Sequence, residues 1–131
     1  MKCLIKRKKI MRKTIPIKSN REFTRVYKKG KFFAGKYIVL YMLPNGLNIN
    51  RLGITASKKA GKSIRRNRIK RLIKENYRLN EEFVRSGFDL VFVARNNEML
   101  PDYYDIKKEM CFLFRKLKLV DEEKNNCLKK C

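Results

Sequence analysis

The strongest chemical signal in the sequence is a run of basic residues at positions 58–78. Ten of these residues are Lys or Arg, and Glu75 is the only acid among them. Gly61 allows the backbone to turn into a helix and Ser63 can cap it, and the amides of a helix N-terminus attract phosphate oxygens. Guanidinium groups suit bidentate phosphate contacts or stacking on bases, and an amide can pair with a base edge or a ribose. The residues that offer these groups are Arg65, Arg66, Arg68 and Asn67.

The charge of the whole chain points in the same direction. Of its 131 residues, 35 are Lys or Arg and 12 are Asp or Glu, which gives a formal net charge of +23. This charge exceeds what solubility needs and opposes compaction, so we expect a polyanionic partner, with nucleic acid the best fit. The alternative is a merely solvated basic helix. It is disfavoured because like charges three and four positions apart repel, and a solvated face normally mixes signs.

The side chains that a protein nuclease needs are missing from the sequence. It has no His, and its acids are scattered, so we expect neither proton transfer nor metal-assisted phosphoryl chemistry from protein groups. We predict no catalytic residue and no protein metal site. The four Cys form no CxxC pair, and we interpret them as incidental thiols in a reducing compartment.

A second chemical feature is an apolar strand predicted at residues 36–43. Its two faces are both apolar because side chains alternate along a strand. Such a strand belongs in the middle of a sheet, or has one buried face and one apolar binding face. One face carries Tyr37, Val39, Tyr41 and Leu43, and the other carries Ile38, Leu40 and Met42.

Apolar spacing and turn residues predict the elements that position these groups. A short helix begins at Ser19, which forms a capping box with Glu22, and ends at Gly30 in a left-handed conformation. A basic helix spans residues 63–78, and Asp102 caps a last helix. Further strands are predicted at residues 51–57 and 88–94. Core positions are Ile69, Leu72, Ile73 and Tyr77 in the basic helix, and Ile106, Met110, Leu113, Phe114 and Leu117 in the last helix.

This order of elements indicates the α+β class. We expect a single compact α/β sandwich in the order α-β-β(-β)-α-β-α, because a chain of this length buries one core. The domain should span residues 17–119, between a disordered basic arm at residues 1–16 and a frayed polar tail at residues 120–131. No apolar run approaches the ~20 residues of a membrane span, and residues 1–13 are too basic for a secretory signal. We therefore expect a cytoplasmic protein with no membrane partner.

Several motifs resemble those of the bacterial ribonuclease P protein family, from about residue 17 to about residue 117. The most specific lies inside the basic run and reads Arg66-Asn67-Arg68-Ile69-Lys70-Arg71-Leu72, after Ser57-Lys58-Lys59 and Gly61. The residues Asn20 to Phe23, Ile38 to Tyr41 and Leu113 to Lys116 resemble the family's first helix, central strand and last helix. The basic extension before Met11 and the Cys-bearing tail depart from the family pattern.

The resemblance implies that an RNA subunit and the protein have different roles. The RNA subunit would carry the active site and its Mg²⁺ ions, with no organic cofactor and no protein partner required, and the protein would bind that catalytic RNA and precursor tRNA. The fold would include a left-handed βαβ crossover. The RNA-binding residues would be Lys58, Lys59, Arg65, Arg66, Asn67, Arg68, Lys70, Arg71 and Lys74. The cleft for the single-stranded 5′ leader would be lined by Phe23, Tyr27, Val39 and Tyr41.

Physical chemistry supports such a cleft, because an aromatic surface beside basic residues is what single-strand binding uses. The hydroxyls of Tyr27 and Tyr41 suit a surface that is partly exposed to water. For Phe23, a core role is about as plausible as a binding role. A structural ribosomal protein or an RNA chaperone would also be small, basic and without catalytic side chains. It would not need the motif run together with the aromatic strand.

Overall fold

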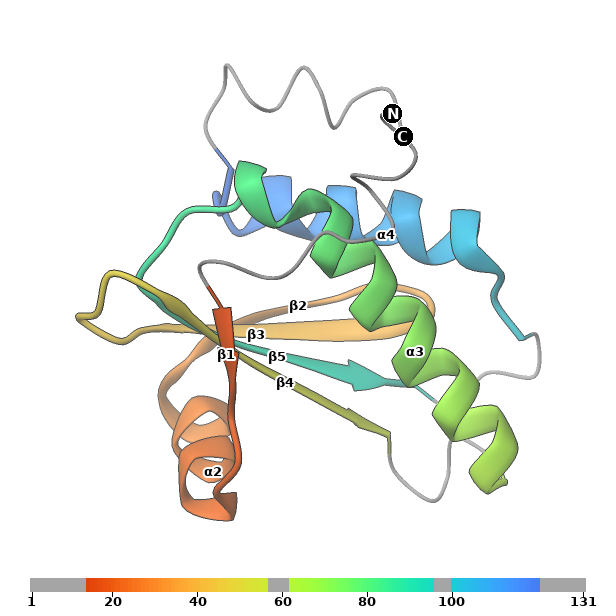
Figure 1. Ribbon diagram of the computed structural model, residues 1–131, viewed down its shortest axis with the longest axis horizontal. Helices are drawn as coiled ribbons and strands as arrows, with labels where there is room; N and C mark the ends of the chain where they lie inside the picture. The colour runs from red at the N-terminus through yellow and green to blue at the C-terminus, as the bar shows by residue number, and fades with distance from the viewer. Residues whose placement is uncertain (1–13, 57–61, 96–99, 121–131) are drawn as a thin grey trace, which may run out of the picture.

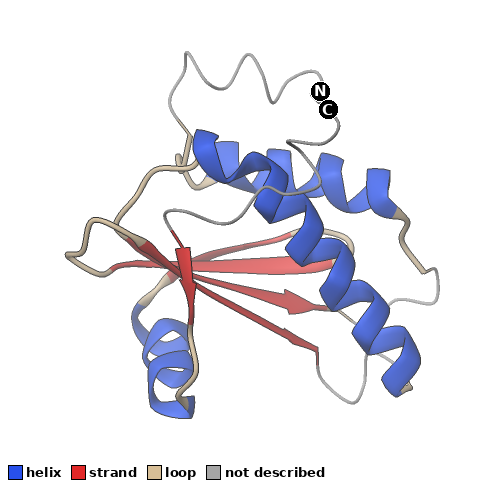
Figure 2. Cartoon of the chain, viewed as in Figure 1, coloured by secondary structure: helices blue, strands red, loops and turns tan. Residues whose placement is uncertain are grey.

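The computed structural model describes residues 14–56, 62–95 and 100–120. Within them, five strands form one mixed sheet in the order β1-β4-β5-β3-β2. Figure 1 shows α3 and α4 on one face of the sheet and α2 on the other, and Figure 2 shows the same layers by element type. The strands are β1 (Thr14–Pro16), β2 (Lys31–Ala34), β3 (Ile38–Pro44), β4 (Asn50–Ala56) and β5 (Phe88–Ala94). The helices are α2 (Asn20–Lys29), α3 (Ser63–Asn80) and α4 (Tyr103–Lys116), with a 3-10 turn, η2 (Glu81–Phe83).

This architecture is the α+β sandwich that the sequence predicts. β2 is the optional strand of the expected order, and β3 pairs with it and with β5 in antiparallel fashion. β4 and β5 are parallel neighbours joined through α3, which gives the βαβ unit that the resemblance implies. The left-handed sense of that crossover stays a prediction.

The two faces of β3 have different environments. Ile38, Leu40 and Met42 are buried in the main core beneath α3 and α4. Val39 and Tyr41 point to the opposite face and are only half-buried. β3 is thus an interior strand, paired on both sides, with one buried face and one partly open face, so features of both interpretations are present. The predicted core positions on α3 and α4 are buried, except Leu72 and Leu117, which are partly buried against the core.

Among the described residues, the predicted domain is too short by three residues at its N-terminal end and by one at its C-terminal end. Residues 14–16, assigned to a disordered arm, form β1, which pairs in parallel with residues 50–52 of β4. Val120, assigned to the tail, is 8% exposed and bridges to Val84. The remaining parts of the predicted arm and tail, residues 1–13 and 121–131, lie outside the described residues.

The ends of α2 also differ from prediction. The Ser19 hydroxyl accepts a hydrogen bond from the Glu22 amide as expected, but the Glu22 carboxylate pairs with Arg51 instead of completing a capping box. Gly30 is extended, with φ −80° and ψ 159°, not left-handed. A glycine is needed there because a Cβ would lie 2.6 Å from the Val26 carbonyl oxygen. At α4, Asp102 caps the helix as predicted, through a reciprocal capping box with Asp105.

Tyr77 fixes the basic helix α3 to the edge of the sheet. Its ring is fully buried, and its hydroxyl lies 2.8 Å from the Thr14 hydroxyl of β1 and 3.3 Å from the Asn50 side-chain nitrogen of β4. Burial raises the pKa of the Tyr77 phenol above its ordinary value, so the group stays protonated at neutral pH. One side chain therefore joins β1, β4 and α3.

Tyr77→Phe should destabilise the fold without emptying the core. Removing the hydroxyl leaves buried groups of Thr14 and Asn50 without a partner, which costs about 1–3 kcal/mol. Urea unfolding should show this loss in the free energy of unfolding. Tyr104→Phe, at a residue that is 67% exposed, is the matched control and should change stability by no more than about 0.5 kcal/mol. Equal effects of the two variants would contradict the anchoring role.

Among the described helices, none is long and apolar enough to cross a membrane. Cys111 on α4 is buried. The other three Cys, which the sequence analysis interprets together with it, lie outside the described residues.

Candidate nucleic-acid interface

The basic helix α3 turns one side to the core and leaves a charged side in solvent. Ile69, Ile73 and Tyr77 are buried on the inner side. Four of the predicted binding residues on the outer side are exposed: Asn67, Arg68, Arg71 and Lys74. Three are half-buried: Arg65, Arg66 and Lys70. Lys58 and Lys59 lie outside the described residues. The structure thus brings seven of the nine predicted positions onto one helix.

The start of α3 differs in detail from the prediction. Lys62 occupies the N-cap position, with no side-chain hydrogen bond to the helix, and Ser63 is the first helical residue. The Ser63 hydroxyl instead accepts a hydrogen bond of 3.2 Å from the Arg66 guanidinium. Arg66 is therefore partly held by its own helix, whereas Arg68 and Arg71 are exposed.

The four predicted cleft residues lie together on the face of the sheet that carries α2. Phe23 and Tyr27 come from α2, with ring centroids 6.4 Å apart, and the Tyr27 ring meets the edge of Tyr41 at 5.0 Å. Val39 is two residues before Tyr41 on the same face of β3 and is half-buried. The Tyr27 hydroxyl lies 3.4 Å from the Thr55 hydroxyl on β4. The structure places these residues near one another, and their role in binding a leader stays a prediction.

The short helix α2 covers only part of this sheet face. Val26 packs with Ile17 and Val91 in a small second core, against which Phe23 and Tyr41 are partly buried. Further along the strands, Val39, Thr55 and Val93 remain half-buried. Because β5 lies between β3 and β4, these three residues form a continuous row across the sheet, paired in register at Val93. A mostly apolar, half-buried floor therefore lies beside the aromatic side chains.

An ion-pair network around one buried carboxylate holds α2 on the sheet, and sequence reasoning missed it. Asp89 on β5 is completely buried and accepts two hydrogen bonds from the Arg51 guanidinium, at 2.7 and 2.6 Å. Arg51 also pairs with Glu22 of α2, and the exposed guanidinium of Arg25 lies 3.8 Å from Asp89. The hydrogen bond to Asp89 raises the pKa of Arg51. The network crosses from β5 through β4 to α2, so it sets the position of the cleft wall.

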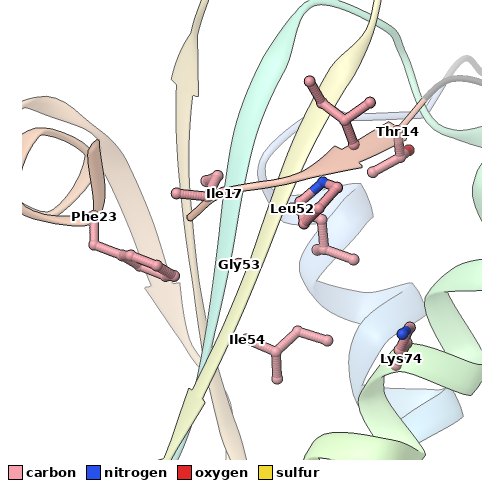
Figure 3. Close-up of a pocket in the computed structure, with 9 residues that line it drawn as sticks. Thr14, Ile17, Phe23, Leu52, Gly53, Ile54 and Lys74 are labelled. Atoms are coloured by element: carbon pink, nitrogen blue, oxygen red, sulfur yellow. The ribbon is translucent and has the colours of Figure 1, made fainter. Parts of the chain in front are cut away.

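A pocket at the outer edge of β4 joins the cleft to the basic helix. β1 pairs with β4 only along residues 50–52, so the next residues of this edge line a hollow. Figure 3 shows Phe23 of α2 on one side and Lys74 of α3 on the other, with Gly53 and Ile54 of β4 between them. An apolar cleft residue and a motif cation therefore face the same space.

Together, the fold and these two surfaces define a small basic protein of the α+β class with a cationic helix and a partly open aromatic sheet face. The comparisons with known proteins agree with this class. The family model described as Ribonuclease P matches residues 11–118, and the chain belongs to this family. Its members are the protein part of an endoribonuclease complex that processes tRNA with an RNA subunit.

Individual relatives support the assignment in sequence and in structure. A ribonuclease P protein component from Clostridium botulinum (strain Langeland) is 52% identical over 101 residues, covering 76% of this chain and 91% of that protein. The structure of the Staphylococcus aureus RNase P protein has a TM-score of 0.73 at 32% identity, covering 81% of this chain and 97% of that chain. The RNase P protein from Thermotoga maritima has a TM-score of 0.68 at 31% identity, covering 77% and 96%.

Proposed function

We propose that this chain is the RNA-binding subunit that holds the 5′ leader of precursor tRNA against the catalytic RNA of ribonuclease P. The complex would remove the leader by Mg-dependent endonucleolytic cleavage and give the mature 5′ end of the tRNA. The observation that carries the proposal is the gathering of Phe23, Tyr27 and Tyr41 on the sheet face that α2 leaves partly open. Aromatic rings at such a surface stack bases with little sequence preference, as a leader of variable sequence requires.

The outer side of α3 would bind the catalytic RNA. Arg68, Arg71 and Lys74 are exposed on successive turns, where they can reach phosphates without leaving the core contacts of the helix. Arg65, Arg66 and Lys70 lie closer to the body of the protein and would make supporting contacts, and Asn67 can reach a base edge or a ribose. Lys58 and Lys59 would extend this surface.

The chemistry would belong to the RNA subunit. The chain has no His, the side chain that most often transfers protons in enzymes. We propose that the Mg²⁺ ions are held mainly by RNA, that no organic cofactor or further protein is needed, and that the complex works in the cytoplasm. The protein's formal charge of +23 would lower the repulsion between two polyanions, the catalytic RNA and the precursor tRNA.

Reconstitution tests the proposal directly. Protein freed of all RNA should cleave no precursor tRNA in the presence of Mg²⁺, whereas the protein combined with its cognate RNA should release the 5′ leader at a single position. The measurement is leader release on a denaturing gel, with RNA alone as a further control. Cleavage by rigorously RNA-free protein at a rate comparable to that of the complex would overturn the proposal that the RNA subunit carries the chemistry.

Gly53→Ala should disturb the leader cleft through Phe23. A Cβ at position 53 would lie 2.4 Å from Cε1 of the Phe23 ring, so the ring must move. Such overpacking typically costs about 1–3 kcal/mol of stability, and the displaced ring should weaken binding of precursor tRNA more than binding of mature tRNA. Thermal unfolding and the two affinities check both expectations.

A second substitution tests whether the clash is the cause. In the Gly53→Ala background, Phe23→Leu should cost less stability than it does in the wild-type protein, because it removes the clashing ring edge. Additive stability losses would show that the two residues do not interfere, and the assigned cause would then be wrong.

A further inference from the structure

Phe32 is an aromatic residue that the predicted cleft did not include. It lies on β2, the edge strand of the sheet, and its side chain is 59% exposed. Its ring stacks on Tyr41 with centroids 5.3 Å apart and an interplanar angle of 29°. The pairing of Phe32 with Tyr41 in the β2–β3 register sets this contact. Phe32 therefore extends the row Phe23, Tyr27, Tyr41 by one ring.

Phe33, the next residue on β2, has a different environment from Phe32. Phe33 points to the opposite face of β2, where it meets the edge of Phe112 on α4 at 5.6 Å. Phe33 thus packs against the helix layer, whereas Phe32 leaves more than half of its surface in solvent beside the cleft. An exposed ring that stacks on one side presents its other face to a planar ligand.

The surroundings of Phe32 suit a polyanion. Residues 28–36 contain four Lys, at positions 28, 29, 31 and 36, and no acid. Lys28 and Lys29 are exposed at the end of α2, and only Gly30 separates that helix from β2. The charge disfavours contact between two copies of this chain through β2, because each copy would bring the same cluster of cations.

The edge strand is also held in a defined position. The Glu109 carboxylate of α4 accepts hydrogen bonds from three consecutive amides at the β2–β3 turn, those of Lys36, Tyr37 and Ile38, at 2.7, 2.8 and 2.6 Å. The Arg95 guanidinium donates to the Gly35 carbonyl at 2.6 Å. The turn that carries β2 is therefore fixed to α4 and β5, and Phe32 is presented without a large cost of ordering on binding.

We propose that Phe32 stacks a nucleobase of single-stranded RNA, one position beyond the base held at Tyr41. The inference rests on the proposed function, since the ligand is the same leader strand. It lengthens the leader-binding surface from the cleft onto the edge strand. A stacking ring accepts any base, so this subsite adds affinity for leaders long enough to reach it rather than sequence preference.

Abasic nucleotides test this inference. Holoenzyme is reconstituted with the cognate RNA, and its affinity is measured for precursor tRNAs whose leaders carry one abasic nucleotide at each position in turn. With wild-type protein, the abasic change at the Phe32 position should weaken binding by about 5- to 150-fold. With Phe32→Ala protein, this change should have no further effect, while abasic changes elsewhere should keep their full effect.

Two further variants separate the possible results. Phe33→Ala removes the same side chain one residue away on the opposite face and should leave every abasic effect unchanged. Tyr41→Ala should abolish the effect at a different, adjacent leader position. If Tyr41→Ala abolishes one abasic effect and Phe32→Ala abolishes none, the Phe32 subsite is refuted and the leader cleft stands. If both act at the same position, Phe32 only positions Tyr41 and the inference is overturned. If neither abolishes any effect, the inference and the leader cleft are both refuted.

Discussion

Replacing Arg68, Arg71 and Lys74 together with alanine should weaken assembly of the protein with the ribonuclease P RNA and make assembly less sensitive to salt. Each phosphate contact that is lost should reduce the slope of log affinity against log salt concentration by roughly 0.7 to 0.9. Three lost contacts should therefore reduce it by roughly 2 to 3. The affinity difference from the wild-type protein should be largest at low salt and shrink as salt rises. Filter binding over a salt series measures both quantities.

The fold should survive this triple substitution. All three side chains are exposed, alanine favours helix, and the core positions of α3 are untouched. Far-UV circular dichroism and the unfolding temperature should stay close to those of the wild-type protein. The residues are chosen by exposure, since Arg66 bonds to Ser63 within the helix.

A matched variant on α4 separates a specific surface from diffuse charge. Replacing Lys107, Lys108 and Lys116 with alanine removes the same charge from the other helix on this face of the sheet. If α3 makes the RNA contacts, the α4 variant should change the salt slope by less than one third as much. Equal changes from the two variants would mean that α3 is only a solvated basic face.

The helices were predictable because their signals are local and repeated. α3 and α4 bury Ile69, Ile73, Met110 and Phe114 at helical spacing, so the period alone gives their extent and inner face. β1 has no comparable signal. Its three residues include Pro16, and its place depends on pairing with β4 and on Tyr77, which lies 63 positions from Thr14. Contacts of that kind are set by the assembled fold.

The same distinction between local signals and contacts set by the assembled fold applies to the candidate site. Alternation along β3 places Val39 and Tyr41 on one face, so the floor of the cleft follows from the sequence. Phe32 does not, because its contact with Tyr41 depends on the register of the β2–β3 pair. Asp89 is a single acid in an apolar strand, and nothing in its neighbours shows that Arg51 and Glu22 converge on it. The sequence pattern therefore predicts which residues share the two candidate surfaces, whereas the groups that position these surfaces are found only in the structure.

Tyr41→Ala should reduce the preference of the holoenzyme for precursor over mature tRNA. The Tyr41 ring contacts Tyr27 and Phe32 and lies at the centre of the aromatic row. If a leader base stacks there, its loss should cost about 1–3 kcal/mol, or roughly 5- to 150-fold in affinity for precursor tRNA. Mature tRNA has no leader, so its affinity should hardly change.

Stability must be measured alongside affinity because Tyr41 is also partly buried against the small core of Ile17, Val26 and Val91. The alanine variant should unfold at a lower temperature whether or not it binds a base, so a lower unfolding temperature alone decides nothing. Tyr41→Phe keeps the ring and should preserve the affinity ratio. A purely structural Tyr41 would weaken both tRNA ligands by the same factor and leave the ratio at its wild-type value, and that result would remove Tyr41 from the leader site.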